Sequence, residues 1–343
     1  MALRHVRHLP AQLPVVAALG QTLIARRRAS PPTGELVATV APPHPALVRD
    51  YVEHVGGDAA AYRAMLPPHL FPQWSFPLAA RTLRGLPYPL TRIVNAGCSL
   101  SKQAPLPAGE PLLVRASLTS IDDDGRRAIL TQRVVTGTAR DADALVATIT
   151  TVVPLRPARS AGKASDTAAT RSTRSGRDAN NGTAAHSASP KQAASIPYDA
   201  HELARWSLAR DAGLAFAVLT GDFNPIHWLS RAGIAAGFGG PILHGFAMFA
   251  RAIEGVTRAR FAGNPSHVRT WSAKFTRPLR LPADVALFAR GEDIWIGDAP
   301  GTAPYLAMTL ATTEGTDTTF TTDVSGHRSG TDATSATQAG DPS

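Results

Sequence analysis

The chain has 343 residues, 44% of them hydrophobic, which is enough for two domains of ordinary size with a core each. Its single cysteine, Cys98, excludes an intramolecular disulfide and a cysteine-built zinc site and fits a reducing compartment. The formal net charge of +9 raises the question of nucleic-acid binding, but no recognition motif accompanies it, so we expect no nucleic-acid partner.

The first 34 residues are rich in Arg and contain no acidic residue. Their apolar centre, LPVVAALGQTLIA, resembles a signal or transit peptide, and it also fits an amphipathic first helix ended by the breaker SPPTG. We favour the helix, because no small-residue cleavage site follows the apolar part. No apolar run approaches the roughly 20 residues that a membrane-spanning helix needs. We therefore expect a cytoplasmic protein, with organellar targeting left open.

Residues 35–156 are predicted to form helices followed by a sheet. Two stretches near the start, HPALVRDYVEHV and DAAAYRAML, have helical patterns, and a Pro-punctuated stretch follows them. Four predicted strands are rich in Val, Ile, Leu and Thr: RIVNAGCSL, PLLVRASLTSID, RRAILTQRVVT and ALVATITTVVPL. DDDG marks a tight turn between the second and third. Short links between consecutive strands favour an antiparallel meander.

Two segments have almost no large apolar side chains, namely residues 157–196 and 314–343. Such segments bury too little surface to offset the entropy of the chain. We predict a disordered linker and a disordered tail.

Residues 197–313 repeat the order of helices followed by strands. ELARWSLA is predicted as a strand, and DAGLAFAVLTG as a helix with Asp211 as its N-cap and Gly221 as its stop. An apolar helix, FAMFARAIEGVTRARF, comes next, and the strands VRTWSAKFT, ADVALFARGED and APYLAMTLAT close the block. Two blocks with the same element order indicate a duplicated α+β unit.

The stretch TGDFNPIHWLSRAGIAAGFGGPILHG, residues 220–245, carries the candidate chemistry. Asn224-Pro225 is a turn initiator, so Asp222 and His227 lie on either side of a rigid bend that can bring their side chains together. When this pattern stands alone, an Asx-turn with a histidine packed nearby is the favoured explanation.

Gly245 follows His244 at the start of the apolar helix. A helix N-terminus has unpaired N–H groups that bind anions or developing oxyanions, and a glycine lets a ligand approach the backbone. An ordinary N-cap explains Gly245 alone, but not its pairing with an acid and an imidazole upstream. An acid, a base and an oxyanion-stabilising amide are together what proton abstraction next to a carbonyl requires.

This stretch resembles the hydratase signature of MaoC-like dehydratases and (R)-specific enoyl-CoA hydratases: G-D-x-N-P-[IL]-H, then G-F-x-x-P-I-x-H-G. The similarity extends into KFTRPLRLPADVALF. The order of a motif-free first half, a linker and a motif-bearing second half resembles the two-domain (3R)-hydroxyacyl-thioester dehydratases.

The resemblance implies a double hotdog, in which each half is an antiparallel sheet wrapped around a helix. It implies a non-catalytic hotdog at 35–156, which shapes the acyl tunnel, and a catalytic one at 197–313. Asp222 and His227 would be the acid/base pair that polarises the catalytic water, and the N–H of Gly245 would bind the thioester oxygen. The supporting residues would be Asn224, Pro225 and His244. No metal or other cofactor is implied.

The implied activity is a lyase reaction, the reversible dehydration of (3R)-3-hydroxyacyl thioesters to trans-2-enoyl thioesters in fatty-acid or related acyl metabolism. The partner would be an acyl-CoA or an acyl carrier protein thioester. The resemblance leaves open the acyl length, the carrier, the pathway and the direction of the reaction. It also leaves open whether the protein forms a homodimer and which proton Asp222 and His227 each handle. A non-catalytic acyl-thioester-binding hotdog and a hotdog thioesterase are the alternatives, although Glu254, the one acid in the central helix, lies far from its start.

Two further points concern side chains away from the motif. Family hydratases often place a Ser in the active-site helix, whereas GFAMFARAIEG has no Ser or Thr before Thr257. Because of this departure, the groups that would hydrogen-bond the substrate are not assigned, whereas the acid/base pair is. In the first half, His54 and Asp58 are predicted to be surface residues at a helix end.

Overall fold

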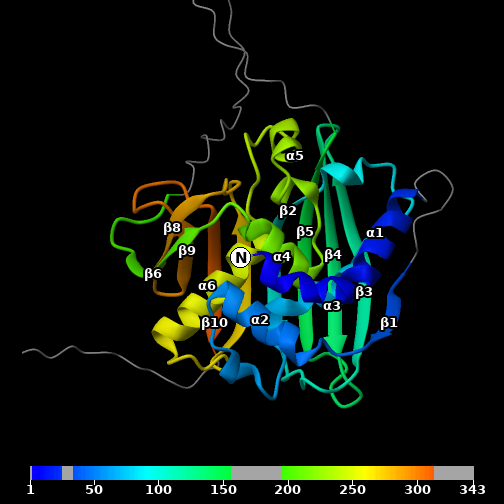
Figure 1. Ribbon diagram of the computed structural model, residues 1–343, viewed down its shortest axis with the longest axis horizontal. Coiled ribbons are helices and arrows are strands. Elements are labelled where there is room, and N and C mark those ends of the chain that lie inside the picture. The colour runs from blue at the N-terminus through cyan, green and yellow to red at the C-terminus, as the bar shows by residue number, and fades with distance from the viewer. Residues whose placement is uncertain (1, 25–33, 156–194, 313–343) are drawn as a thin grey trace, which may run out of the picture. The chain divides into compact units, whose positions relative to one another are not determined.

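The computed structural model describes residues 2–24, 34–155 and 195–312. They form one ten-stranded antiparallel sheet with helices packed on one of its faces (Figure 1). The strands are β1 (Leu36–Val40), β2 (Val94–Lys102), β3 (Leu112–Asp123), β4 (Arg127–Gly137), β5 (Leu145–Pro154), β6 (His201–Leu208), β7 (Val268–Phe275), β8 (Ala283–Arg290), β9 (Asp293–Gly297) and β10 (Leu306–Thr312). The helices are α1 (Leu13–Ile24), α2 (Pro45–Val55), α3 (Phe71–Thr82), α4 (Ala212–Thr220), α5 (Ser230–Ala235) and α6 (Gly245–Arg260).

The strand order is a duplicated one, as the element order in the sequence indicated. It reads β1-β3-β4-β5-β2 in the first half and β6-β8-β9-β10-β7 in the second. The predicted meander is therefore confirmed for β3, β4 and β5 but wrong for β2, which pairs with β5 and not with β3. The two halves meet where β2 pairs with β7 in antiparallel register, with Ser99 opposite Ser272. Gly97 makes this contact close, because a Cβ there would lie 2.7 Å from the carbonyl oxygen of Ala273. The halves therefore share one continuous sheet.

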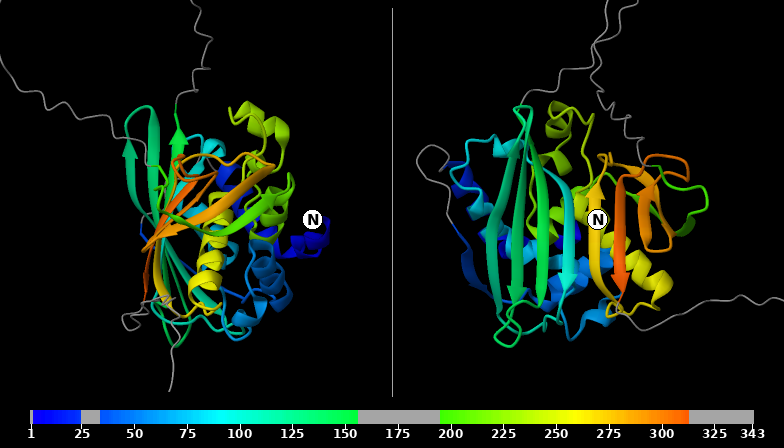
Figure 2. Two further views of the ribbon diagram at one scale, coloured as in Figure 1. Left: turned by 90° about the vertical axis from the view of Figure 1, so that its left-hand side faces the viewer. Right: turned by 180° about the vertical axis from the view of Figure 1, so that it is seen from behind.

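Helix α6 is the central helix of the second half, and every residue from Phe246 to Thr257 is buried. It packs against β6, β9 and β10 of its own half and against α2 and β2 of the first half. In the edge-on view the helices form a second layer on one side of the sheet (Figure 2). The opposite side, seen from behind, has no helix of the described residues in front of it. This layering gives strands such as β5 their strict alternation of buried and half-buried residues.

Helix α3 takes the corresponding place in the first half. It packs on β1, β3 and β4, where Trp74 Nε1 donates to Thr136 Oγ1 at 3.1 Å and Gln132 Nε2 donates to the Ala79 carbonyl oxygen at 2.8 Å. The sequence prediction left this stretch unassigned because of its prolines. Pro72 stands in the first turn, which tolerates proline, and Pro77 is accepted inside the helix because the tertiary contacts hold it.

Three other predictions of local structure were wrong or incomplete. The short edge strand β1 was not predicted, and DAAAYRAML forms only a 3₁₀ turn at Ala59–Tyr62. The single strand expected over ADVALFARGED ends at Arg290 as β8, and β9, which was not predicted, pairs back on it after a turn at Gly291 with φ of +56°. A left-handed glycine in a two-residue loop is a strong hairpin signal, and it identifies the missed turn.

The N-terminal segment is helical, as favoured above, with a 3₁₀ helix at Ala2–Gln12 followed by α1. Its 3₁₀ part packs on α4, and α1 packs on α3. His54 of α2 is buried under it, 7% exposed and with its ring 5.8 Å from that of His5, so the prediction that His54 lies on the surface was wrong. Asp58 is exposed, as predicted. The predicted linker and tail lie outside the described residues, apart from residues 195 and 196.

Candidate functional site

The candidate motif begins where α4 ends at Gly221. This glycine has φ of +83°, and its N–H donates to the carbonyl oxygen of Ala217 at 2.7 Å, so it is the predicted helix stop. A Cβ at Gly221 would meet Val15 Cγ2 at 2.7 Å and Gln12 Oε1 at 2.8 Å. The N-terminal helices therefore pack directly against the residue that precedes Asp222.

Asn224 and Pro225 form the predicted bend. The Asn224 N–H donates to Asp222 Oδ1 at 3.4 Å, and the side chain of Asn224 accepts from the Ile226 N–H at 3.4 Å. Asn224 Nδ2 also donates to the carbonyl oxygen of Ile93, 131 residues away in the first half, at 3.3 Å. The bend is thus bonded both to itself and to the other half of the fold.

The imidazole of His227 has a defined orientation and is 7% exposed. Its Nδ1 lies 2.9 Å from the carbonyl oxygen of Ile242. Because a carbonyl only accepts hydrogen bonds, Nδ1 carries the proton in the neutral ring and Nε2 carries the lone pair. The half-buried carboxylate of Asp222 and the rings of His227 and His244 each offer an atom within 4.8 Å of the other two. The structure therefore brings the predicted acid and base together.

His244 lies between the motif and the core and is fully buried. Its Nε2 donates to the carbonyl oxygen of Asp222 at 2.9 Å. Its ring stacks on that of His227 and lies 5.0 Å from that of Phe216, between ring centroids. His244 thus connects the start of α6 to the two residues of the predicted acid/base pair.

Burial sets the protonation of these groups. It raises the pKa of Asp222 above the ordinary carboxyl value, and the charge of His227 and the Asn224 N–H partly oppose it. Burial lowers the pKa of His227, with the charge of Asp222 and the bond to Ile242 in opposition. Burial, aided by the neighbouring His227, holds the pKa of His244 well below the ordinary histidine value. Each shift favours the uncharged form of its group.

Gly245 is the first residue of α6, so its N–H has no acceptor within the helix. No hydrogen bond joins this N–H to another group of the described residues. A Cβ at Gly245 would lie 2.6 Å from the ring of Phe275, so only glycine fits between the ring and the helix start. The amide is thereby available to an oxygen atom close to the acid/base pair.

The described residues hold two groups with the spacing of metal ligands. One is Asp222, His227 and His244, and the other is His5, His8 and Asp50. In the second group Arg7 Nη2 bonds the same Asp50 oxygen at 2.6 Å that His8 contacts at 2.8 Å. A cation bound to this oxygen would have to compete with the guanidinium.

A buried polar network also joins the two halves, and motif reasoning did not find it. Glu254 of α6 accepts from Tyr62 at 2.7 Å and pairs with His69 at 2.8 Å, and Tyr51 contacts the other ring nitrogen of His69. Arg251 donates to the carbonyl oxygen of His54 at 2.7 Å. The one available signal was Glu254, an acid inside an apolar helix.

The fold and the site together define a class. Ten antiparallel strands in two topologically equal halves, each packed on its own helix, make a double hotdog of the α+β class, as the resemblance implied. Residues 183–299 match the family model of the MaoC like domain. The matched stretch covers most of the second half and contains the site described above. No curated protein sequence matches the chain significantly.

Solved structures share this architecture. HtdX of Mycobacterium tuberculosis superimposes with a TM-score of 0.59 at 19% identity, over 80% of this chain and 99% of that one. A MaoC-like dehydratase from Phytophthora capsici superimposes with a TM-score of 0.57 at 14% identity, over 82% of this chain and 96% of that one. The peroxisomal multifunctional enzyme type 2 of Drosophila melanogaster gives 0.55 at 16% identity, over 81% of this chain and 48% of that one. At these identities the likeness concerns the fold.

Proposed function

We propose that this chain is a hydro-lyase that dehydrates (3R)-3-hydroxyacyl thioesters reversibly to trans-2-enoyl thioesters. The observation that carries the proposal is the pairing of Asp222 with a His227 whose Nδ1 is held by Ile242. Dehydration removes the α-proton and expels hydroxide, so one group accepts a proton while another donates one. An imidazole with a fixed lone pair on Nε2 and a carboxyl group of raised pKa suit these two tasks.

The N–H of Gly245 supports the same reaction. As the α-proton leaves, negative charge develops on the thioester oxygen, and a fixed amide at a helix N-terminus stabilises that charge. Asn224 and Pro225 hold the bend, and His244 fixes its backbone through the Asp222 carbonyl. Tyr62 and His69 already engage Glu254, so that carboxylate is not directed at a thioester, which favours a dehydratase over a thioesterase.

The setting of the reaction follows from the same proposal. The substrate carrier is coenzyme A or an acyl carrier protein, and the pathway is fatty-acid or related acyl metabolism. None of the described helices is both long and apolar enough to cross a bilayer. We place the enzyme in the cytoplasm, because a chain whose single cysteine, Cys98, is buried and needs no disulfide suits the reducing conditions there.

The test is hydration of crotonyl-CoA, with the enoyl absorbance and the free thiol followed in the same tube. We expect loss of the enoyl signal without thiol release in the wild type, and a loss of roughly 10²-fold or more in kcat for His227→Ala. His201→Ala removes an exposed histidine from β6 and is the matched control. Thiol release would indicate a thioesterase, and binding of the thioester without either signal would indicate a non-catalytic protein.

A further inference from the structure

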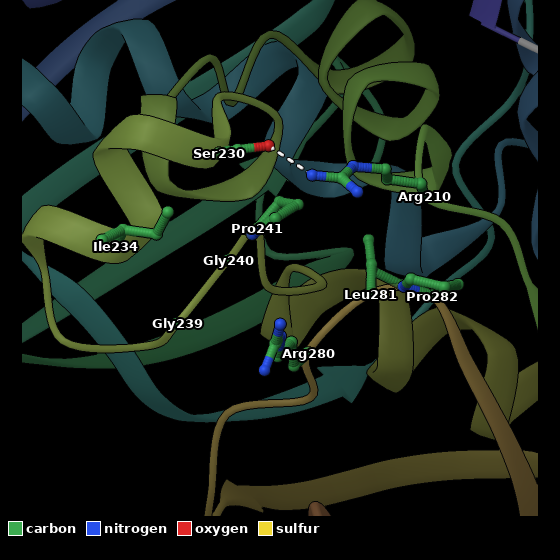
Figure 3. Close-up of a pocket in the computed structure, with 9 residues that line it drawn as sticks. All are labelled: Arg210, Ser230, Ile234, Gly239, Gly240, Pro241, Arg280, Leu281 and Pro282. Atoms are coloured by element: carbon green, nitrogen blue, oxygen red, sulfur yellow. Dashed lines mark hydrogen bonds between the residues drawn. The ribbon is translucent and has the colours of Figure 1, made fainter.

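A cavity of about 350 Å³ lies beside the site (Figure 3). Its walls are the segment around Gly239–Pro241 and the segment Arg280–Pro282. Hydrogen bonds join these segments, from the Leu281 N–H to the Pro241 carbonyl oxygen and from the Leu243 N–H to that of Leu279. The next residue along the first wall is Ile242, whose carbonyl oxygen holds His227. The cavity is therefore separated from the candidate catalytic base by one short stretch of backbone.

Two arginines face this cavity, above and below Pro241 in Figure 3. Arg210 Nη2 donates to Ser230 Oγ at 2.8 Å, which fixes its guanidinium. Arg280 lies along the backbone of two glycines, since a Cβ at Gly240 would be 3.1 Å from its Nε and a Cβ at Gly239 would be 3.4 Å from its Nη1. Both positively charged groups thus lie at the cavity wall, and a hydrogen bond holds that of Arg210.

Neither arginine has a carboxylate partner among the described residues, and no acidic residue lines the cavity. Two other arginines of this half are paired, Arg277 with Asp298 at 2.6 Å and Arg290 with Asp199 at 3.0 Å. Two guanidinium groups and a hydroxyl around an acid-free cavity form a site for an oxyanion, and guanidinium geometry suits phosphate. The ligand we expect is therefore a phosphate group.

We propose that this cavity binds the phosphate ester at the far end of the pantetheine arm of the thioester substrate. The inference rests on the proposed function, because it takes the thioester carrier as the source of the phosphate. Coenzyme A and the prosthetic group of a carrier protein share this phosphate next to pantetheine, and only coenzyme A adds a nucleotide. The cavity then anchors the carrier while the thioester reaches Asp222, His227 and Gly245.

The experiment compares three thioesters as substrates: crotonyl-pantetheine, crotonyl-4′-phosphopantetheine and crotonyl-CoA. For the variant Arg210→Ala/Arg280→Ala we expect KM to rise about tenfold for the two phosphate-bearing substrates, with kcat unchanged and with crotonyl-pantetheine unaffected. Arg231→Ala is the control, because Arg231 is exposed on α5 next to Ser230 but does not line the cavity. Thermal melting verifies that each variant is folded.

Three results would overturn the inference. These are an equal rise in KM for crotonyl-pantetheine, a rise confined to crotonyl-CoA, and an equal effect of Arg231→Ala, which would show a diffuse positive field instead of a site. If the wild type hydrates none of the three thioesters, the proposed function fails on its own. Calorimetric titration with coenzyme A then decides about the cavity: weaker binding by the double variant supports the site, and equal binding refutes it.

Discussion

The imidazole rings of His227 and His244 stack with their centroids 3.7 Å apart and their planes 25° from parallel. The stack lets His244 support His227 through its ring and Asp222 through the bond from Nε2 to the Asp222 carbonyl oxygen. The two contributions can be separated by substitution, since phenylalanine keeps a ring and removes the hydrogen bond, whereas alanine removes both.

We expect His244→Phe to lower kcat for hydration and His244→Ala to lower it further, by up to about 10²-fold, because displacement of a catalytic group by about 1 Å has effects of that size. Steady-state kinetics with crotonyl-CoA measures both variants. Wild-type rates in a folded His244→Ala protein would contradict the supporting role of this residue.

Asp222→Asn is expected to abolish most activity and at the same time to raise Tm at neutral pH. The pKa of Asp222 is raised in the folded protein above its ordinary value of 3.8. A carboxyl group with a raised pKa stabilises the fold at pH values below the pKa that the same group has in the unfolded chain. This contribution is lost as the pH rises through the group's pKa in the folded protein. At pH 7 the unfolded chain carries this carboxylate ionised in water, whereas the folded protein must either desolvate the charge or bind a proton, and asparagine removes this cost. Melting curves at pH 4 and pH 7 test this: the gain in Tm should be larger at pH 7, and a fall in Tm at pH 7 would contradict the argument.

Gly221→Ala tests the contact between the N-terminal helices and the motif. The substitution adds left-handed strain of about 1 kcal/mol and a clash with Val15 and Gln12, which displaces Asp222, so both stability and kcat should fall. Gly237→Ala is a matched control, because Gly237 also has a positive φ, +86°, but nothing lies within 4 Å of the added Cβ. Gly237→Ala should therefore lower stability and leave kcat unchanged. Equal kcat values for the two variants would show that the N-terminal helices do not influence the site.

Glu254→Ala should lower the free energy of unfolding by about 3 kcal/mol, because it leaves His69 and Tyr62 without their buried acceptor. Glu292→Ala removes an exposed glutamate from the β8–β9 turn and should change stability little. Differential scanning fluorimetry compares the two variants. Similar melting temperatures would mean that the network contributes nothing to holding the halves together.

A second half produced from about residue 195 should aggregate or form a homodimer. Without the first half, β7 loses its partner β2, and Glu254 loses both of its hydrogen-bond partners. If the first half also shapes the acyl tunnel, any such dimer should hydrate only short acyl thioesters. Size-exclusion chromatography with a chain-length activity series measures both properties. A soluble monomer with the chain-length preference of the full protein would contradict both expectations.

Local chemistry made much of this protein predictable from sequence. The strands of the first half carry strong β patterns, although their order in the sheet is not that of a simple meander, and a left-handed glycine ends α4 where expected. The candidate site was predictable for the same reason, because Asp222, Asn224, His227 and Gly245 stand within one contiguous stretch of 26 residues whose bend is encoded by Asn-Pro. The pattern failed where context overrode it, as in α3, whose inner proline is tolerated only because the helix is held against the sheet.

The contacts between distant residues were decided by the tertiary structure alone. His54 carries the sequence signals of a surface residue, yet the N-terminal helices cover it. The tautomer of His227 depends on the Ile242 carbonyl oxygen, and Asn224 is anchored by the Ile93 carbonyl oxygen. Arg210 and Arg280 line the same cavity because two separate loops meet there. Local propensity and hydrophobic period act over a few residues, and they determine which elements form. Which buried donor meets which acceptor is determined by packing between elements far apart in the chain, and no pattern along the sequence records it.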